Sequence, residues 1–262
     1  MRTLGVDLAA ADERTALAEI DWYAGGAAVR NLRLGVTDQE IVQAVGRADK
    51  AGLDCPLGWP VAFAEFLAAQ QHGRVPAPPD GRTGAAWRRR LAYRVTDEVV
   101  RARTGLIPLS VSADRIAHAA FRCAALLAAL PQPVDRTGAG VVVEVYPAAA
   151  LHRWGLAHRG YKTTGHAFLV DDLLTAAPWL DLGACEPLCR SSHDAFDAVI
   201  AALAARAAAL GATGVPDAAQ RAAARTEGWI AVPTGELADL PDPQPGTPGR
   251  GVIRKRMPGT PG

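Results

Sequence analysis

Three short apolar segments of the chain each contain a single charged residue, and in each segment that residue is a carboxylate. The three carboxylates belong to Asp7, Asp54 and Glu144. Burying an unpaired carboxylate costs several kcal/mol, so each of them requires a cation or a hydrogen-bonding partner. All three lie near the C-terminal end of an expected strand, and ligands of open α/β sheets gather at that edge. This pattern therefore favours a sheet with a polar site at one end of its strands.

The order of the expected elements predicts an α/β fold with a mixed sheet. Strands are expected at residues 3–9, 15–22, 27–34, 51–55 and 141–145, with a short late strand at 227–233. The pair Gly25-Gly26 favours a tight turn between the second and third strands, so the sheet is expected to open as an antiparallel meander. The run 141–145 is apolar apart from its one carboxylate, which is typical of a strand in the centre of a sheet.

Helices are expected between and after these strands. They are predicted at residues 37–48, 148–154, 167–176 and 194–210, with several more inside 61–130. Thr37 and Glu40 have the spacing of a capping box for the first of them. We interpret 61–130 as a helical insertion in a single domain that spans 1–239. Residues 240–262 contain six Pro, five Gly and a basic cluster, and we expect this tail to be disordered.

Composition and charge narrow the class of protein. Hydrophobic residues make up 49% of the chain and charged residues 21%, so the chain as a whole is not of the disordered type. The net charge is only +1, and a polyanion would therefore have to bind to a local basic patch. No signal-peptide pattern and no bilayer-spanning apolar run are evident, and the four cysteines are sparse. These features predict a cytoplasmic protein with reduced thiols and no membrane association.

A pair of acidic residues adds to the three strand carboxylates. Asp194 and Asp197 are three residues apart on a largely apolar expected helix, so their Cβ atoms should lie about 5 to 6 Å apart on one face. Together the five carboxylates would form an oxygen-only site of the kind that Mg²⁺ or Mn²⁺ prefers. We predict Asp7, Asp54, Glu144 and Asp197 as metal ligands, with Asp194 added to the catalytic set.

Ordinary structural roles are open to several of the same residues. Asp194 follows Ser191 by three residues and could complete a capping box at the start of its helix. Asp54 could cap the turn that follows its strand, and Glu144 could pair with an arginine. Asp197 lies a turn further into the helix, where a capping role no longer applies. The argument for a site therefore depends on the shared pattern rather than on any one of these residues.

A basic stretch provides candidate contacts to an anionic substrate. Residues 82–103 contain seven arginines and two acidic residues, with one Trp and one Tyr among them. This combination suits both phosphate contacts and stacking on unpaired bases. We predict that Arg90 and Arg94 contact substrate and that Lys162 contacts the scissile phosphate. A solvated charged helix, or an ion pair between Arg94 and Asp97, is the structural alternative.

Several motifs resemble the RNase H-like superfamily. Gly5-Val-Asp-Leu-Ala9 resembles the first metal-binding strand of those nucleases, and Asp194-Ala-Phe-Asp-Ala198 looks like the Asp-x-x-Asp-Ala helix of the Holliday-junction resolvases. The match is closer to the domain of unknown function 429 family, whose members are described as predicted RNase H-like nucleases, and it covers about residues 3–233. Further shared motifs are Leu53-Asp-Cys-Pro-Leu-Gly58, Arg94-Val-Thr-Asp97, Glu144-Val-Tyr-Pro147, Tyr161-Lys162, His193-Asp-Ala-Phe-Asp-Ala198 and Glu227-Gly-Trp-Ile-Ala-Val-Pro233.

The resemblance implies both a fold and an activity. The implied fold is a mixed five-stranded sheet, three antiparallel strands followed by two parallel to the first, with helices on both faces. The implied activity is hydrolysis of phosphodiester bonds in DNA or RNA by a nuclease that depends on Mg²⁺ or Mn²⁺. The acidic residues of the family carry over onto Asp7, Asp54, Glu144 and Asp197, with Asp194 as an addition.

Two other functions are compatible with the same opening strands. One is a nucleic-acid-binding module that keeps the fold without turnover, although the intact carboxylate set argues against it. The other is an actin-like phosphotransferase that uses ATP. That activity requires phosphate-binding loops, and the residues after Asp7 lack the Gly-rich turn expected there.

Overall fold

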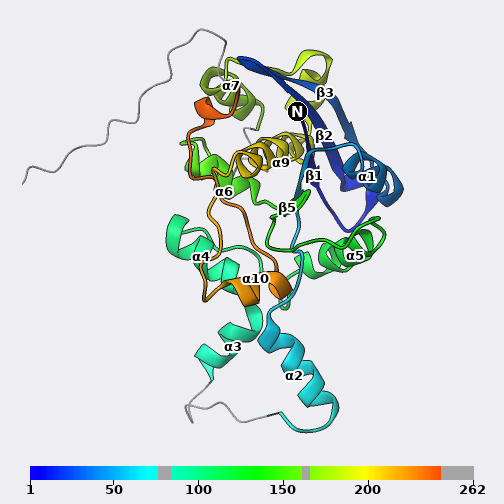
Figure 1. Ribbon diagram of the computed structural model, residues 1–262, viewed down its shortest axis with the longest axis vertical. Coiled ribbons are helices and arrows are strands. Elements are labelled where there is room, and N and C mark those ends of the chain that lie inside the picture. Colours follow the sequence, from blue (N-terminus) through cyan, green and yellow to red (C-terminus); the bar gives the residue numbers. More distant parts are fainter. Residues whose placement is uncertain (76–83, 161–165, 243–262) are drawn as a thin grey trace, which may run out of the picture.

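A single mixed sheet forms the centre of the molecule. The computed structural model describes residues 1–75, 84–160 and 166–242, and Figure 1 shows the arrangement of their elements. The sheet has six strands in the order β5-β4-β1-β2-β3-β6. Their bounds are β1 Arg2–Asp7, β2 Ala16–Tyr23, β3 Gly26–Leu34, β4 Lys50–Asp54, β5 Val142–Glu144 and β6 Leu180–Asp181.

The pairing of the strands agrees with the predicted mixed α/β sheet. Strands β1, β2 and β3 form an antiparallel meander, and β4 runs parallel to β1 and β5 parallel to β4. The structure adds a sixth strand, β6, which pairs in parallel with β3. Only two residues form β6, so it has no periodicity from which a strand could be predicted.

The prediction that residues 141–145 form a central strand is wrong, because β5 lies at the edge of the sheet. Its side chains are nevertheless buried on both faces. The later segment around Ile230 covers the open side of β5, where Ile230 forms a bridge with Glu144. The segment 227–233, which was predicted to be a strand, forms only isolated β-bridges, at Ile230 and Pro233. The apolar pattern of β5 therefore reflects cover by this segment rather than a central position.

Helices cover both faces of the sheet, as predicted. Their bounds are α1 Asp38–Val45, α2 Val61–Gln71, α3 Ala85–Ala92, α4 Val95–Thr104, α5 Ile116–Ala128, α6 Pro147–Arg153, α7 His166–Ala176, α8 Glu186–Ser191, α9 His193–Ala209 and α10 Arg221–Glu227. The capping box of Thr37 and Glu40 at the start of α1 is confirmed. Helix α9 packs against β1, β2 and β4, and α1 and α5 contribute to a second core on the opposite face.

Helices α2 to α5 occupy the predicted insertion 61–130. The pair α2 and α3 projects from the end of the molecule remote from the meander (Figure 1), and no residue of either helix is fully buried. The Pro-rich part of the insertion, 76–83, and the predicted tail from 243 onward lie outside the described residues. Among the described residues, no helix is both long and apolar enough to cross a bilayer.

Two glycines allow α9 to lie directly on the strands. A Cβ atom built on Gly5 of β1 would overlap the carbonyl oxygen of Ala198 and the amide nitrogen of Ala202 in α9. On Gly52 of β4, a Cβ atom would lie 2.6 Å from the carbonyl oxygen of Ala201. Because Gly5 and Gly52 are partners in the parallel pairing of β1 and β4, they form one flat contact under the helix backbone.

The Gly5→Ala substitution should therefore destabilise the fold. The added methyl group would collide with helix backbone, which cannot move aside as a flexible side chain can, so we expect a loss of about 2 kcal/mol or more in the free energy of unfolding. The matched control is Gly140→Ala, where a Cβ atom would meet nothing within 4 Å. Urea denaturation of both variants measures the difference, and equal stabilities would contradict the close contact.

Candidate metal centre

Two of the predicted acidic residues lie side by side at the ends of parallel strands. Asp7 ends β1 and Asp54 ends β4, and the two are direct partners in the register. Side chains alternate between the faces of a strand, so partners in register project from the same face. Gly5 and Gly52, two residues earlier, lie under α9. Asp7 and Asp54 therefore also project from the face that α9 covers.

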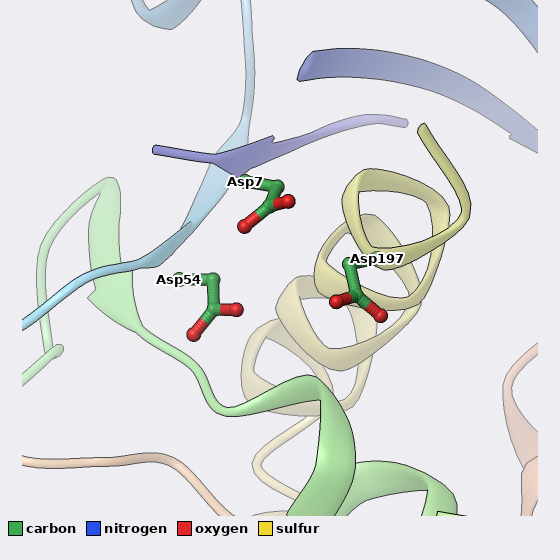
Figure 2. A group of neighbouring side chains, drawn as sticks. All are labelled: Asp7, Asp54 and Asp197. Atoms are coloured by element: carbon green, nitrogen blue, oxygen red, sulfur yellow. The ribbon is translucent and has the colours of Figure 1, made fainter. Parts of the chain in front are cut away.

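Helix α9 provides the third member. Asp197 lies in the second turn of the helix, and its side chain is buried, with 0% of its surface exposed. One carboxylate oxygen from each of Asp7, Asp54 and Asp197 lies within 4.8 Å of the others. Figure 2 shows the three side chains, from β1, β4 and α9, directed into one space. We call these three residues the aspartate cluster.

A pocket opens beside the aspartate cluster. It has a volume of about 550 Å³, and Asp7, Asp54, Tyr146 and His158 contribute to its wall. The pocket lies where β1, β4 and β5 end, the edge predicted to hold a site. Two members of the aspartate cluster can therefore be reached by a molecule that enters the pocket.

The Glu144 side chain projects from the other face of the sheet, although Glu144 also lines the pocket beside Asp7 and Asp54. Its partner in the β4–β5 register is Leu53, one residue before Asp54, so Glu144 and Asp54 project in opposite directions. Its carboxylate accepts hydrogen bonds from Arg94, at 2.7 and 2.8 Å, and from the Leu57 amide at 3.0 Å. Glu144 therefore forms an ion pair with an arginine, which was its structural alternative, and it is not part of the aspartate cluster.

Arg94 is buried, with 1% of its surface exposed. Its guanidinium donates to the carboxylates of Asp97 and Glu144 and to the carbonyl oxygen of Glu227. Burial alone would lower the pKa of Arg94, but the charges of Glu144 and Asp97 outweigh this effect and raise it. Burial raises the pKa of Glu144, against the opposing effects of Arg94 and the Leu57 amide.

These contacts show the ion pair between Arg94 and Asp97 that was the structural alternative. Arg94 also lines the pocket, and its contact with substrate stays a prediction. Helix α3 ends at Ala92 and Arg94 is the N-cap of α4, so Arg90 and Arg94 belong to different helices. A glycine makes room for the ion pair: Gly228 has a φ of +92°, and a Cβ atom there would lie 2.6 Å from Glu144 Oε2.

Asp194 does not take its predicted capping role. The N-cap of α9 is Ser192, whose side chain accepts a hydrogen bond from Ala195, so the predicted capping box with Ser191 is absent. The carboxylate of Asp194 instead accepts two hydrogen bonds from Arg14, at 2.7 and 3.1 Å. Sequence reasoning missed Arg14, since the two residues are 180 positions apart and no local pattern links them.

The remaining predicted contacts lie away from the aspartate cluster or outside the described residues. Arg90 is exposed on α3 and borders a small pocket with Glu65 and Phe66 of α2. Lys162 belongs to 161–165, which the structure does not describe.

The aspartate cluster fits a hard divalent cation. Its ligand atoms are carboxylate oxygens from two strands and a helix, and Mg²⁺ and Mn²⁺ favour such ligands over nitrogen or sulfur. Three carboxylates so close together repel one another unless a cation or protons lie between them. The arrangement can thus hold a cation at the mouth of the pocket.

Cation binding should be visible as a gain in thermal stability that requires Asp197. At a Mn²⁺ concentration about 100 times the dissociation constant, binding to the folded state adds about 2.7 kcal/mol. We expect Mn²⁺ to raise the Tm of the parent protein and to have little effect on Asp197→Asn.

The matched control for this measurement is Asp172→Asn, which removes an exposed carboxylate of α7. It should keep the full shift in Tm. A shift of equal size in Asp197→Asn would show that the cation binds elsewhere.

Comparison with known proteins identifies a family. The model of the family described as protein of unknown function (DUF429) matches residues 5–221, which is most of the chain. The match confirms the family that the sequence motifs indicated. No curated protein and no solved structure matched the chain.

Proposed function

Because the chain belongs to the family described as protein of unknown function (DUF429), we propose a function from the geometry of the site. The protein is a divalent-metal-dependent nuclease that hydrolyses phosphodiester bonds in DNA or RNA. The observation that carries this proposal is the aspartate cluster, which joins two parallel strand ends and a buried helix position at the mouth of a pocket.

The chemistry of hydrolysis accounts for this set of residues. Mg²⁺ or Mn²⁺, when bound, lowers the pKa of a coordinated water and neutralises charge on the phosphate. In the proposed site, Asp7 would hold the cation jointly with Asp54 and Asp197. The buried position of Asp197 fixes its carboxylate, and the pocket beside Asp7 and Asp54 admits the substrate.

The RNase H-like interpretation belongs to the same proposal. Its support is the strand order, in which an antiparallel meander is followed by two strands parallel to the first. The carboxylates of β1 and β4 together with an acidic helix residue agree with the resemblance in the motifs. The added strand β6 extends the sheet at the side remote from the aspartate cluster and leaves this correspondence intact.

Exposed aromatic and basic groups support a nucleic acid as the substrate. The ring of Trp59, five residues after Asp54, stacks on Phe121 of α5 with centroids 5.7 Å apart and an interplanar angle of 20°. Phe121 is 60% exposed, so its outer face is available for an unpaired base. Helix α3 adds three consecutive arginines, Arg88 to Arg90, on the projecting part of the molecule.

A non-catalytic nucleic-acid-binding module is the second candidate. The same aromatic and basic groups would serve it, but it gives no reason for three carboxylates to be gathered at a pocket. A phosphotransferase of the actin-like type remains the least favoured, since the turn after β1 is a short 3₁₀ segment, Asp12–Arg14, without the glycines of a phosphate-binding loop.

Nuclease assays with the purified chain test the proposal. Single strands, duplexes, RNA–DNA hybrids and branched junctions are incubated with Mg²⁺ or Mn²⁺. We expect cleavage of at least one substrate and a loss of more than about 100-fold in Asp7→Asn and Asp54→Asn, because metal-assisted stabilisation is worth several kcal/mol. Asp172→Asn should retain activity within about twofold. Cleavage that survives in both cluster variants would refute the site.

A second prediction concerns the aromatic stack. Phe121→Ala removes an exposed ring, so folding stability should change by no more than about 0.5 kcal/mol. Binding to an unpaired strand should weaken by about 1 to 3 kcal/mol, while binding to a duplex should change little. The matched control is Phe168→Ala on α7, whose ring is 75% exposed. Fluorescence anisotropy measures both, and equal losses in the two variants would argue against a base-stacking role.

A further inference from the structure

The side chain of Arg14 contacts the first turn of α9 and has a fixed orientation. Its Nε and Nη2 atoms donate to the two carboxylate oxygens of Asp194, at 2.7 and 3.1 Å, so the pair is side-on and bidentate. Nη2 also lies 3.4 Å from Nε2 of His193. A bidentate pair fixes the plane of the guanidinium as well as its position. Asp194 thus determines where the remaining donors of Arg14 point.

The turn that carries Arg14 is itself held in place. It is the 3₁₀ segment Asp12–Arg14, which follows β1 and the catalytic candidate Asp7. Arg122 of α5 binds this turn and its flanking residues through Nη1 and Nη2, and its Nε donates to α1. Its partners are the side chains of Asp12, Thr15 and Asp38 and the carbonyl oxygens of Ala9 and Val36. The backbone on which Arg14 stands is therefore tied to both β1 and α1.

The outer edge of the Arg14 guanidinium remains available to a ligand. Within residues 1–75, 84–160 and 166–242, Nη1 of Arg14 has no hydrogen-bond acceptor, and the side chain is 61% exposed. The hydrogen bond and charge of Asp194 raise the pKa of Arg14, and the charge of Asp7 adds to this effect. The guanidinium is thus within electrostatic reach of the aspartate cluster.

The spacing of Asp194 and Asp197 along α9 sets the distance from Arg14 to the aspartate cluster. Asp194 and Asp197 are three residues apart in one helix, which separates their Cβ atoms by about 5 to 6 Å. Arg14 therefore stands about one helical turn from the proposed cation site. This separation suits a group that contacts a phosphate of a bound strand while the cation contacts the reacting one.

We propose that Arg14 is a substrate-binding residue that contacts a phosphate of the nucleic-acid strand, and that Asp194 is a positioning residue that orients it. The inference rests on the proposed nuclease function. It assigns to Asp194 a role other than metal ligation, and to Arg14 a role that the sequence did not suggest. An arginine suits this role because its fork of donors matches the oxygens of a phosphate.

The test compares Arg14→Ala and Arg14→Lys with the parent, using the full chain. The Ala variant should lower kcat/KM and strand affinity by about 10- to 100-fold, because a charge-assisted contact is lost. The Lys variant should retain part of both. Mn²⁺ affinity, measured by titration calorimetry, should not decrease in either variant. The matched control is Arg30→Ala, which removes a side chain with 60% exposure from β3.

A substrate-side substitution separates contact from structural support. Strands in which one phosphate at a time is replaced by a neutral methylphosphonate are assayed for cleavage with Mn²⁺ and for binding with Ca²⁺. In the parent, one position should carry a penalty that disappears in Arg14→Ala, since the two changes remove the same contact. Asp194→Asn should reduce that penalty without loss of Mn²⁺ affinity.

Equal penalties at every position in the parent and in Arg14→Ala would overturn the inference. If the parent cleaves no substrate, the proposed nuclease function fails, and the binding measurements still decide whether Arg14 contacts a phosphate.

Discussion

The contact between α9 and the strands beneath it is the constraint on which the site depends. Gly5 and Gly52 present no side chains, so the helix backbone lies directly against β1 and β4. This closeness brings Asp197 to Asp7 and Asp54, whose carboxylates begin two residues further along the same strands. Larger residues at the two glycines would hold the helix away and separate the carboxylates. The site is thus a consequence of helix packing as much as of the acidic residues themselves.

Much of this arrangement could be predicted from the sequence, because it follows from local patterns. The meander, the parallel strand β4, the capped helix α1 and the long helix α9 all have clear periodicity and end signals. Isolated carboxylates in apolar strands pointed to Asp7 and Asp54, and the structure brings these two together with Asp197. Glu144 shows the same isolation, yet it pairs with Arg94 on the opposite face. Register decides between the two outcomes, and a shift of one residue cannot be read from composition.

The other differences arise from contacts between distant parts of the chain. Asp194 satisfied every local criterion for a capping or metal-binding role, but its partner, Arg14, lies after β1. Arg94 lies in a basic stretch of the sequence, but helix α3 ends before it. Its guanidinium points inward and pairs with Asp97 and Glu144. Both arginines are organised by carboxylates that tertiary structure brings to them. A single sequence does not contain that information in any periodic form.

The cover on the outer side of β5 has a consequence for how copies of the protein behave together. Edge strands with unpaired backbone groups are templates for pairing with another chain. Here the strand is only three residues long, and the amide of Ala231 donates to the carbonyl oxygen of Glu144 at 2.9 Å. Pro233, which lacks an amide hydrogen, follows shortly afterwards. At this border of the sheet, the segment around Ile230 disfavours intermolecular strand addition and the aggregation that follows from it.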